Sequence, residues 1–125
     1  MSENAKILLI AEDEPSLMLV LHDRLCQDGF EILKAANGED ALDSALKNHP
    51  DMILLDLLMP VMDGISMLKK LREDAWGKNV RVMVLTNLEE DEKLEEAKEL
   101  GVVDYLIKAN WKIEEVVQKI KDKLL

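Results

Sequence analysis

Residues 52–60 read MILLDLLMP, an apolar stretch interrupted by a single carboxylate at Asp56. Its first part, Met52–Leu55, is apolar without alternation, which is typical of a short strand buried on both faces in a parallel sheet. A carboxylate buried at the end of such a strand is costly unless something compensates for its charge. The stretch therefore predicts a central parallel strand and gives Asp56 an environment that needs a chemical explanation.

Compact apolar runs alternate with helical patterns along the rest of the chain. The other predicted strands are Lys6–Ala11, Glu31–Ala36, Arg81–Leu85 and Val103–Ile107. The predicted helices run from Pro15 to the stop at Gly29, over Gly38–Lys47, Ile65–Arg72 and Glu89–Leu100, and from the cap Asn110 to Leu124. Short strands joined through helices predict an α/β fold, a doubly wound (βα)5 sheet of five parallel strands.

Length and composition exclude several classes of protein. The 125 residues suit one domain, residues 1–125, with no output domain in this chain, and 48% hydrophobic residues argue against disorder. A net charge of −10 disfavours direct binding to nucleic acid and to anionic membranes. The run Ile7–Ile10 is too short for a signal peptide or a membrane span, so a cytoplasmic protein is expected. Cys26 is alone, which excludes a disulfide framework, and its place on a helix predicts a buried thiol.

Polar residues follow four of the predicted strands. Glu12, Asp13 and Glu14 follow the first, Asp56 the third, Thr86 and Asn87 the fourth, and Lys108 the fifth. Each alone has an ordinary explanation as a turn residue, a helix cap or a surface charge. In an open α/β sheet, however, ligands bind beyond the carboxyl ends of the strands. Three acids, a hydroxyl and a lysine are therefore expected to meet at one edge of the sheet.

The cost of gathering these acids points to a cation. Two carboxylates about 4 Å apart repel by roughly 4 kcal/mol at an effective dielectric constant of about 20. A cluster of Glu12, Asp13 and Asp56 should therefore take up a proton or bind a metal ion. Mg²⁺ fits, because it prefers oxygen ligands, needs only one or two carboxylates and shares phosphate oxygens. No His or Cys is placed to favour zinc.

The run DLLMPVMDG at residues 56–64 resembles the phosphoacceptor motif of response-regulator receiver domains of the chemotaxis type, which act in two-component phosphorelays. The acidic pair Glu12-Asp13, Thr86 and the segment Tyr105–Lys108 (YLIK) resemble the other motifs of that family, in the same order. The likeness extends from about Lys6 to Leu125. It implies a flavodoxin-like sheet with strand order 2-1-3-4-5.

The resemblance also implies a site. Asp56 would accept a phosphoryl group from the phosphohistidine of a sensor histidine kinase or phosphotransfer protein, or from a small phosphodonor. Mg²⁺ would be bound by Asp13, by Asp56 and by the backbone carbonyl of Leu58, with Glu12 bound directly or through a water. Lys108 would pair with the phosphoryl oxygens. These roles agree with phosphoryl transfer by positioning and charge neutralisation.

The same family implies a switch. The hydroxyl of Thr86 would turn toward the phosphoryl group, and Tyr105 would swing inward as Thr86 moves. The surface of strand four, helix four and strand five would then change its binding of a downstream protein target. The chain is expected to be a monomer or a weak, phosphorylation-dependent dimer, and to assist its own phosphotransfer and slow dephosphorylation without being an enzyme.

Three departures from the family pattern carry predictions. Glu12 stands where Asp is common, which changes how the metal is reached. Ala109 stands where the family usually has a cis proline. A cis bond to a non-proline residue costs about 2.5–4 kcal/mol, so the Lys108–Ala109 bond is expected to be trans. Asn87, followed by Leu88, stands where the residue after the switch Thr is usually small, and it narrows the access to Asp56. Because neither Leu88 nor Leu58 can orient an attacking water, a slow loss of the phosphoryl group is expected.

One alternative function stays open, and two others are set aside because the chain lacks residues that they need. A pseudo-receiver would use the same fold as a constitutive interaction module without phosphorylation. The substitutions at Glu12, Asn87 and Ala109 are the grounds for this alternative. A flavin-binding flavodoxin needs a Ser/Thr/Gly-rich phosphate loop where this chain has acids. A haloacid-dehalogenase-type phosphatase needs a second Asp at the position of Leu58.

Overall fold

The computed structural model describes residues 5–87, 92–108 and 112–124. Within these residues, five strands form one parallel sheet in the order β2-β1-β3-β4-β5, as expected. The strands are β1 (Ile7–Ala11), β2 (Glu31–Ala35), β3 (Met52–Asp56), β4 (Arg81–Thr86) and β5 (Asp104–Ile107). Both β3 and β4 are one residue longer than predicted, because Asp56 and Thr86 still take part in the strand pairing.

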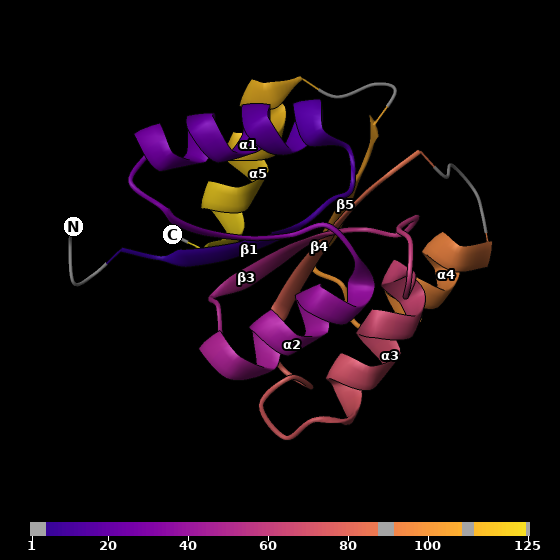
Figure 1. Cartoon of the computed structure of the whole chain (residues 1–125). Helices are drawn as coiled ribbons and strands as arrows, with labels where there is room; N and C mark the ends of the chain where they lie inside the picture. Colours follow the sequence, from indigo (N-terminus) through magenta and orange to yellow (C-terminus); the bar gives the residue numbers. More distant parts are fainter. Residues whose placement is uncertain (1–4, 88–91, 109–111, 125) are drawn as a thin grey trace.

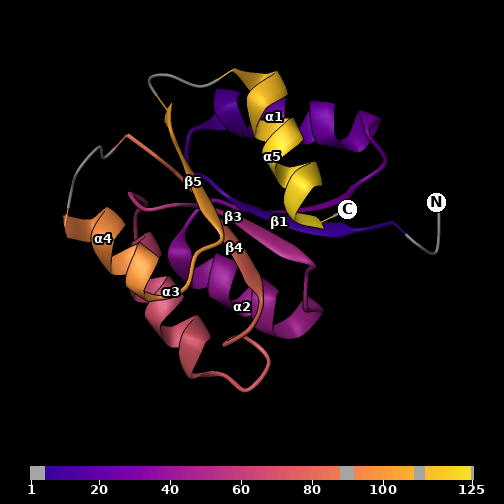
Figure 2. The ribbon, with the colours of Figure 1, turned by 180° about the vertical axis from the view of Figure 1, so that it is seen from behind.

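Helices cover both faces of the sheet. They are α1 (Pro15–Gln27), α2 (Gly38–Asn48), α3 (Gly64–Glu73), α4 (Glu92–Glu99) and α5 (Ile113–Leu124). Figure 1 shows α1 and α5 on one face and α2, α3 and α4 on the other, and Figure 2 shows the same layers from behind. The predicted start of the fourth helix at Glu89 and the cap at Asn110 lie outside the described residues. None of the described helices is long and apolar enough to cross a membrane.

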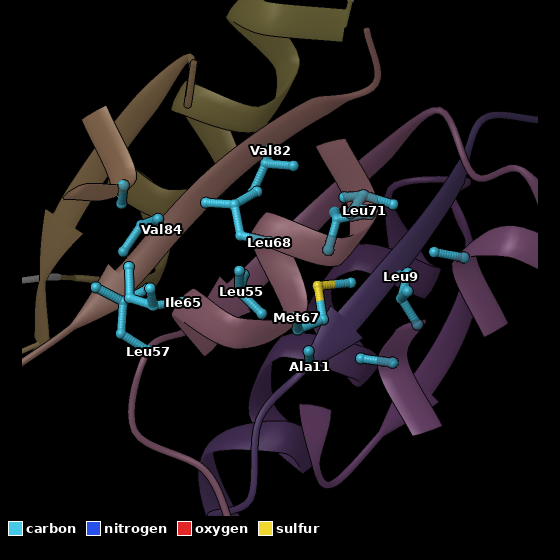
Figure 3. Close-up of a cluster of buried hydrophobic side chains, with 14 of the residues drawn as sticks. Leu9, Ala11, Leu55, Leu57, Ile65, Met67, Leu68, Leu71, Val82 and Val84 are labelled. Atoms are coloured by element: carbon cyan, nitrogen blue, oxygen red, sulfur yellow. The ribbon is translucent and has the colours of Figure 1, made fainter. Parts of the chain in front are cut away.

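The sheet separates two hydrophobic cores, and β3 contributes to both. Ile53 and Leu55 pack beneath α2 and α3, whereas Met52 and Leu54 pack beneath α1 and α5. This explains the unbroken apolar run, because a strand covered on both faces has no solvent side for polar residues. Figure 3 shows the first core, with Leu55 among the residues of the neighbouring strands and of α3.

The buried apolar faces of α1 and α2 are narrow, so residues adjacent to them in the sequence are exposed. In α1, Leu17, Leu21 and Leu25 are buried at four-residue spacing. The prediction of a buried thiol at Cys26 is wrong, since its side chain is exposed. Successive helical residues point about 100° apart, so a residue next to Leu25 leaves the stripe. The same geometry leaves Leu46 exposed beside the buried Ala45 of α2.

Arg72, in the last turn of α3, joins two loops at the end of the sheet opposite the carboxyl ends of the strands. Its Nε donates to the carbonyl of Leu100 at 2.7 Å, and Nη1 donates to Gly77 and Val80 at 2.7 and 2.8 Å; Nη2 donates to Gly101 at 3.3 Å. Burial lowers the pKa of this guanidinium. The fork therefore holds the chain after α3 against the chain after α4.

Replacing Arg72 by Met should lower the free energy of unfolding by about 2–4 kcal/mol, because several carbonyls lose a charged donor. Arg72→Lys should recover less than half of this loss, since an ammonium cannot reproduce the planar fork. Arg24→Met is the matched control, because Arg24 pairs with Asp28 at the surface at 3.5 Å, and exposed pairs contribute about 0–1 kcal/mol. Urea denaturation measures all three. A free energy of unfolding in Arg72→Lys equal to that of the wild type would contradict this account, because a positive charge alone would then hold the two loops.

Candidate functional site

Three acidic side chains meet at the carboxyl edge of the sheet. Glu12 follows β1, Asp56 ends β3, and one oxygen atom from each of Glu12, Asp13 and Asp56 lies within 4.8 Å of the others. Glu12 and Asp56 are buried, with 2% and 4% of their surface exposed, whereas Asp13 is exposed. The predicted cluster therefore forms, with two buried carboxylates and one at the rim.

Lys108 reaches this cluster from the end of β5. Its Nζ lies 2.9 Å from Oδ2 of Asp56 and 2.6 Å from Oε1 of Glu12, and only 11% of its side chain is exposed. The ammonium thus bridges the two buried carboxylates. Lys108 thus points toward Asp56 although Ala109 stands where the sequence comparison expected a proline. The expected trans bond between Lys108 and Ala109 lies outside the described residues.

The proximity of these groups changes their proton affinities. Burial raises the pKa of Glu12 to about 7, and the charge of Asp56 adds to this, although Lys108 and the N–H of Glu14 oppose it. Burial alone would lower the pKa of Lys108, but its contacts with Glu12 and Asp56 outweigh burial and raise it. Lys108 is therefore a fixed positive charge at neutral pH.

Backbone donors hold both buried carboxylates in place. The N–H of Leu58 donates to Oδ1 of Asp56 at 3.1 Å, and the N–H of Glu14 donates to Oε2 of Glu12 at 2.9 Å. Helix α1 begins at Pro15, shortly after Glu12, and a helix start favours negative charge. Each carboxylate is therefore oriented by the chain that follows its own strand.

The loop after Asp56 is packed tightly against the strand. Gly64 begins α3, and a Cβ atom there would overlap the carbonyl oxygen of Asp56 and lie 2.7 Å from Cα of Leu57. Asp63 caps α3, since its Oδ1 accepts from the N–H of Ser66 at 2.8 Å. Asp63 and Gly64 thus set the path of the chain beside Asp56.

The two proposed switch residues occupy different environments. Thr86 is fully buried at the end of β4, next to Ile107 of β5 in the strand pairing. Tyr105 is 38% exposed, and Nζ of Lys98 lies 4.8 Å from the centre of its ring. Thr86 therefore adjoins the site, whereas the side chain of Tyr105 faces outward beside α4.

A surface hollow of about 380 Å³ opens beside Lys108. It is lined by Glu14, Ser16, Leu17, Val20, Asn87 and Lys108. Asn87, which the sequence placed next to the acceptor, is exposed and forms part of this wall. Of the residues of the charged cluster, Lys108 is the one that lines this hollow.

The residues present fit a divalent cation. With all three carboxyls of Glu12, Asp13 and Asp56 ionised, their charge exceeds that of the one ammonium of Lys108 by two, which favours uptake of a cation. Oε1 of Glu12 is buried and, apart from its ion pair with Lys108, accepts no well-directed hydrogen bond among the described residues. Oxygen ligands of this kind suit Mg²⁺, and the three acids form a potential metal site.

Comparison with known proteins places this geometry in a family. The family model of the response regulator receiver domain matches residues 8–121. The chain belongs to this family. Receiver domains are the signalling switches of two-component systems, and the parallel sheet with order 2-1-3-4-5 is the flavodoxin-like fold that they share.

Two relatives show how far the likeness extends. The chain is 35% identical over 118 residues to sporulation initiation phosphotransferase F of Bacillus subtilis, covering 94% of this receiver and 92% of that protein. It is 38% identical over 114 residues to transcriptional regulatory protein SrrA of Staphylococcus aureus, covering 91% of this chain but only 46% of SrrA.

Among solved structures, the receiver domain of sensor histidine kinase PA1611 from Pseudomonas aeruginosa superposes with a TM-score of 0.85 at 30% identity, covering 96% of this chain and 97% of that one. That structure has a magnesium ion coordinated in its active site cleft.

Proposed function

We propose that this receiver is a phosphorylation-activated switch in which Asp56 accepts the phosphoryl group. The observation that carries the proposal is the contact of Lys108 with Asp56 at 2.9 Å inside an acidic cluster. A buried ammonium that touches the acceptor neutralises charge where the phosphoryl oxygens would lie. This is the main requirement of phosphoryl transfer, which depends on positioning and electrostatic stabilisation.

In the proposed reaction, a carboxylate oxygen of Asp56 forms a bond to phosphorus while the bond from phosphorus to the donor breaks. The leaving group is the imidazole of a phosphohistidine, or the carboxylate of a small phosphodonor such as acetyl phosphate, and it takes the bonding electron pair. Lys108 stays protonated and pairs with the phosphoryl oxygens. Glu12, Asp13, Asp56 and the carbonyl of Leu58 would hold Mg²⁺, which supplies further neutralisation of the phosphoryl charge.

The proposed output is a change at the surface of β4, α4 and β5. Thr86 ends β4 beside the strand that carries Asp56, and its hydroxyl would turn toward the new acceptor oxygens on Asp56. Tyr105 lies two residues upstream of Ile107, the pairing partner of Thr86, and its ring would exchange its place beside Lys98 for an inward one. A shift between these two arrangements would alter the binding of a downstream protein.

The proposed partners are proteins. A sensor histidine kinase or a phosphotransfer protein would supply the phosphoryl group, and a downstream target would bind the switched surface. The net charge of −10 supports protein partners over direct binding to nucleic acid. We also propose that the receiver is a monomer, or a weak dimer that forms on phosphorylation.

A pseudo-receiver is the competing function, because Glu12, Asn87 and Ala109 depart from the family pattern and Lys108 is shared between Asp56 and Glu12. Titration of Mg²⁺ and then beryllofluoride, followed by NMR, separates the two. A phosphorylation switch predicts saturable shifts at Asp56, Thr86, Tyr105 and Lys108 that require Mg²⁺. A pseudo-receiver predicts no beryllofluoride-dependent shift at any of these residues.

The phosphorylated form should be long-lived, because Leu58 is an exposed apolar residue two positions after the acceptor and cannot orient water. Leu58→Asn should accelerate phosphate loss by roughly 10-fold, below the roughly 100-fold of a positioned acid or base, since an amide only orients the water. The measurement is loss of phosphate after loading with acetyl phosphate and removal of the donor. Leu46→Asn, on α2, is the matched control for an exposed leucine. Hydrolysis of the wild type within seconds would contradict this account.

A further inference from the structure

The first residue of α2 touches the loop that follows the phosphoacceptor. The N–H of Gly38 donates to the carbonyl of Met62 at 2.9 Å, and Gly38 is buried. Gly38 directly follows the turn between β2 and α2 and lies well before Asp56 in the sequence. This contact therefore holds Met62, near the end of the loop between β3 and α3 (residues 57–63, the acceptor loop). The start of the same loop is held by Asp56, whose Oδ1 accepts from the N–H of Leu58.

No side chain fits at this contact. A Cβ atom on Gly38 would overlap the carbonyl oxygen of Met62 and would lie 2.8 Å from the carbonyl carbon of Met62 and 3.1 Å from the carbonyl oxygen of Asp63. These are backbone atoms, so no flexible side chain can move aside to make room. The loop itself would have to shift.

The braced segment contains a strained turn. The N–H of Met62 donates to the carbonyl of Pro60 at 2.8 Å, and Val61 between them has a φ of 67°. A three-residue turn with positive φ is rare and strained, and positive φ in a β-branched residue is an outlier. Val61 is 77% exposed, so burial of its side chain does not hold the turn. The hydrogen bond from Gly38 restrains the carbonyl end of the turn.

We propose that Gly38 is a positioning residue for the metal site, acting through the strained turn at Val61. By fixing Met62, it fixes the short segment that begins at Asp56 and contains the carbonyl of Leu58. The inference rests on the proposed function, in which that carbonyl is a ligand of Mg²⁺. Residues outside the ligand set that orient ligands typically change metal affinity by about 10–100-fold when altered.

The test compares Gly38→Ala with Gly29→Ala by titration with Mg²⁺ followed by NMR. Gly29 has a φ of 93°, and no atom lies within 4 Å of the place that a Cβ would take, so alanine there strains the backbone without touching the acceptor loop. Gly38→Ala should weaken Mg²⁺ binding by about 10-fold, the low end for such residues, and Gly29→Ala should leave it within about twofold. Phosphorylation by acetyl phosphate should fall in Gly38→Ala at low Mg²⁺ and recover at saturating Mg²⁺.

Two further variants test whether the loss of Mg²⁺ affinity arises through the strained turn at Val61. Val61→Gly relieves the positive φ, so the double variant Gly38→Ala/Val61→Gly should recover most of the lost Mg²⁺ affinity. Asn37→Ala removes the cap of α2, in which Oδ1 of Asn37 accepts from the N–H of Asp40 at 2.8 Å. It should weaken Mg²⁺ binding by about two- to threefold without adding a Cβ at Gly38, and it serves as the test if Gly38→Ala does not fold.

The possible results distinguish a failure of the proposed function from a failure of this inference alone. A wild-type protein that binds no Mg²⁺ and takes up no phosphate overturns the proposed function, and this inference with it. A working wild type with unchanged Mg²⁺ affinity in Gly38→Ala, or in Asn37→Ala where Gly38→Ala is unfolded, overturns this inference alone. Equal losses in Gly38→Ala and Gly29→Ala also overturn it, because the loss would then follow general destabilisation.

Discussion

Asp56→Asn should abolish stable phosphorylation by acetyl phosphate in the presence of Mg²⁺. The amide keeps the shape of the side chain but is not a nucleophile, and loss of a covalent nucleophile should lower the rate of uptake by at least about 1,000-fold. The measurement is the intact mass of the protein after incubation with the phosphodonor, with circular dichroism as the check on folding.

The matched control for Asp56→Asn is Asp43→Asn, which removes a carboxylate from the exposed side of α2. It should take up phosphate at the wild-type rate. Undiminished phosphorylation of Asp56→Asn would assign the acceptor to another residue. Equal losses in both variants would show that the effect comes from charge or handling and not from Asp56.

Lys108→Met should lower the rate of phosphate uptake by about 100-fold, because removing one preorganised donor to a developing charge typically costs this much. It should also destabilise the protein. The buried carboxylates of Glu12 and Asp56 share this ammonium at 2.6 and 2.9 Å. Leaving buried charges without their partner typically costs about 3–5 kcal/mol. Urea denaturation and the rate of uptake are the two measurements.

Mg²⁺ should restore part of the stability of Lys108→Met, because the cation replaces the missing positive charge between the carboxylates. The rise in melting temperature on adding Mg²⁺ should therefore be larger in the variant than in the wild type. Lys119→Met is the matched control, since Lys119 pairs with Asp104 in a half-exposed contact at 3.1 Å. It should cost no more than about 1 kcal/mol and leave phosphate uptake unchanged. Wild-type uptake by Lys108→Met would remove the ammonium from the mechanism.

The sheet and the gathering of polar residues could be predicted from sequence because both follow from local patterns. The apolar run at Met52–Leu55 indicates a strand covered on both faces, and parallel strands end at the same edge. Asp56 and Thr86 therefore had to lie near each other. The distance between Lys108 and the acceptor could not be predicted, because it depends on a loop in which Ala109 replaces the usual proline. The structure shows that Lys108 reaches both carboxylates.

Other parts of the structure depend on contacts that leave no mark in the sequence. Arg72 is an ordinary basic residue for the last turn of a helix, and its acceptors are backbone carbonyls, which every residue has. Gly38 is an ordinary first residue of a helix until Met62 is seen packed against it. The positive φ of Val61 contradicts the preference of a β-branched residue, so only the surrounding contacts reveal it. Such non-local constraints fix the acceptor loop.

The most direct test of the central claim is to locate the phosphoryl group. The protein is loaded with acetyl phosphate, the acyl phosphate is trapped by borohydride reduction, and the modified residue is mapped by peptide mass spectrometry. The account predicts modification at Asp56, present with Mg²⁺ and absent when Mg²⁺ is removed by a chelator. A protein that binds Mg²⁺ but carries no modification, or carries it at a residue other than Asp56, would contradict the account.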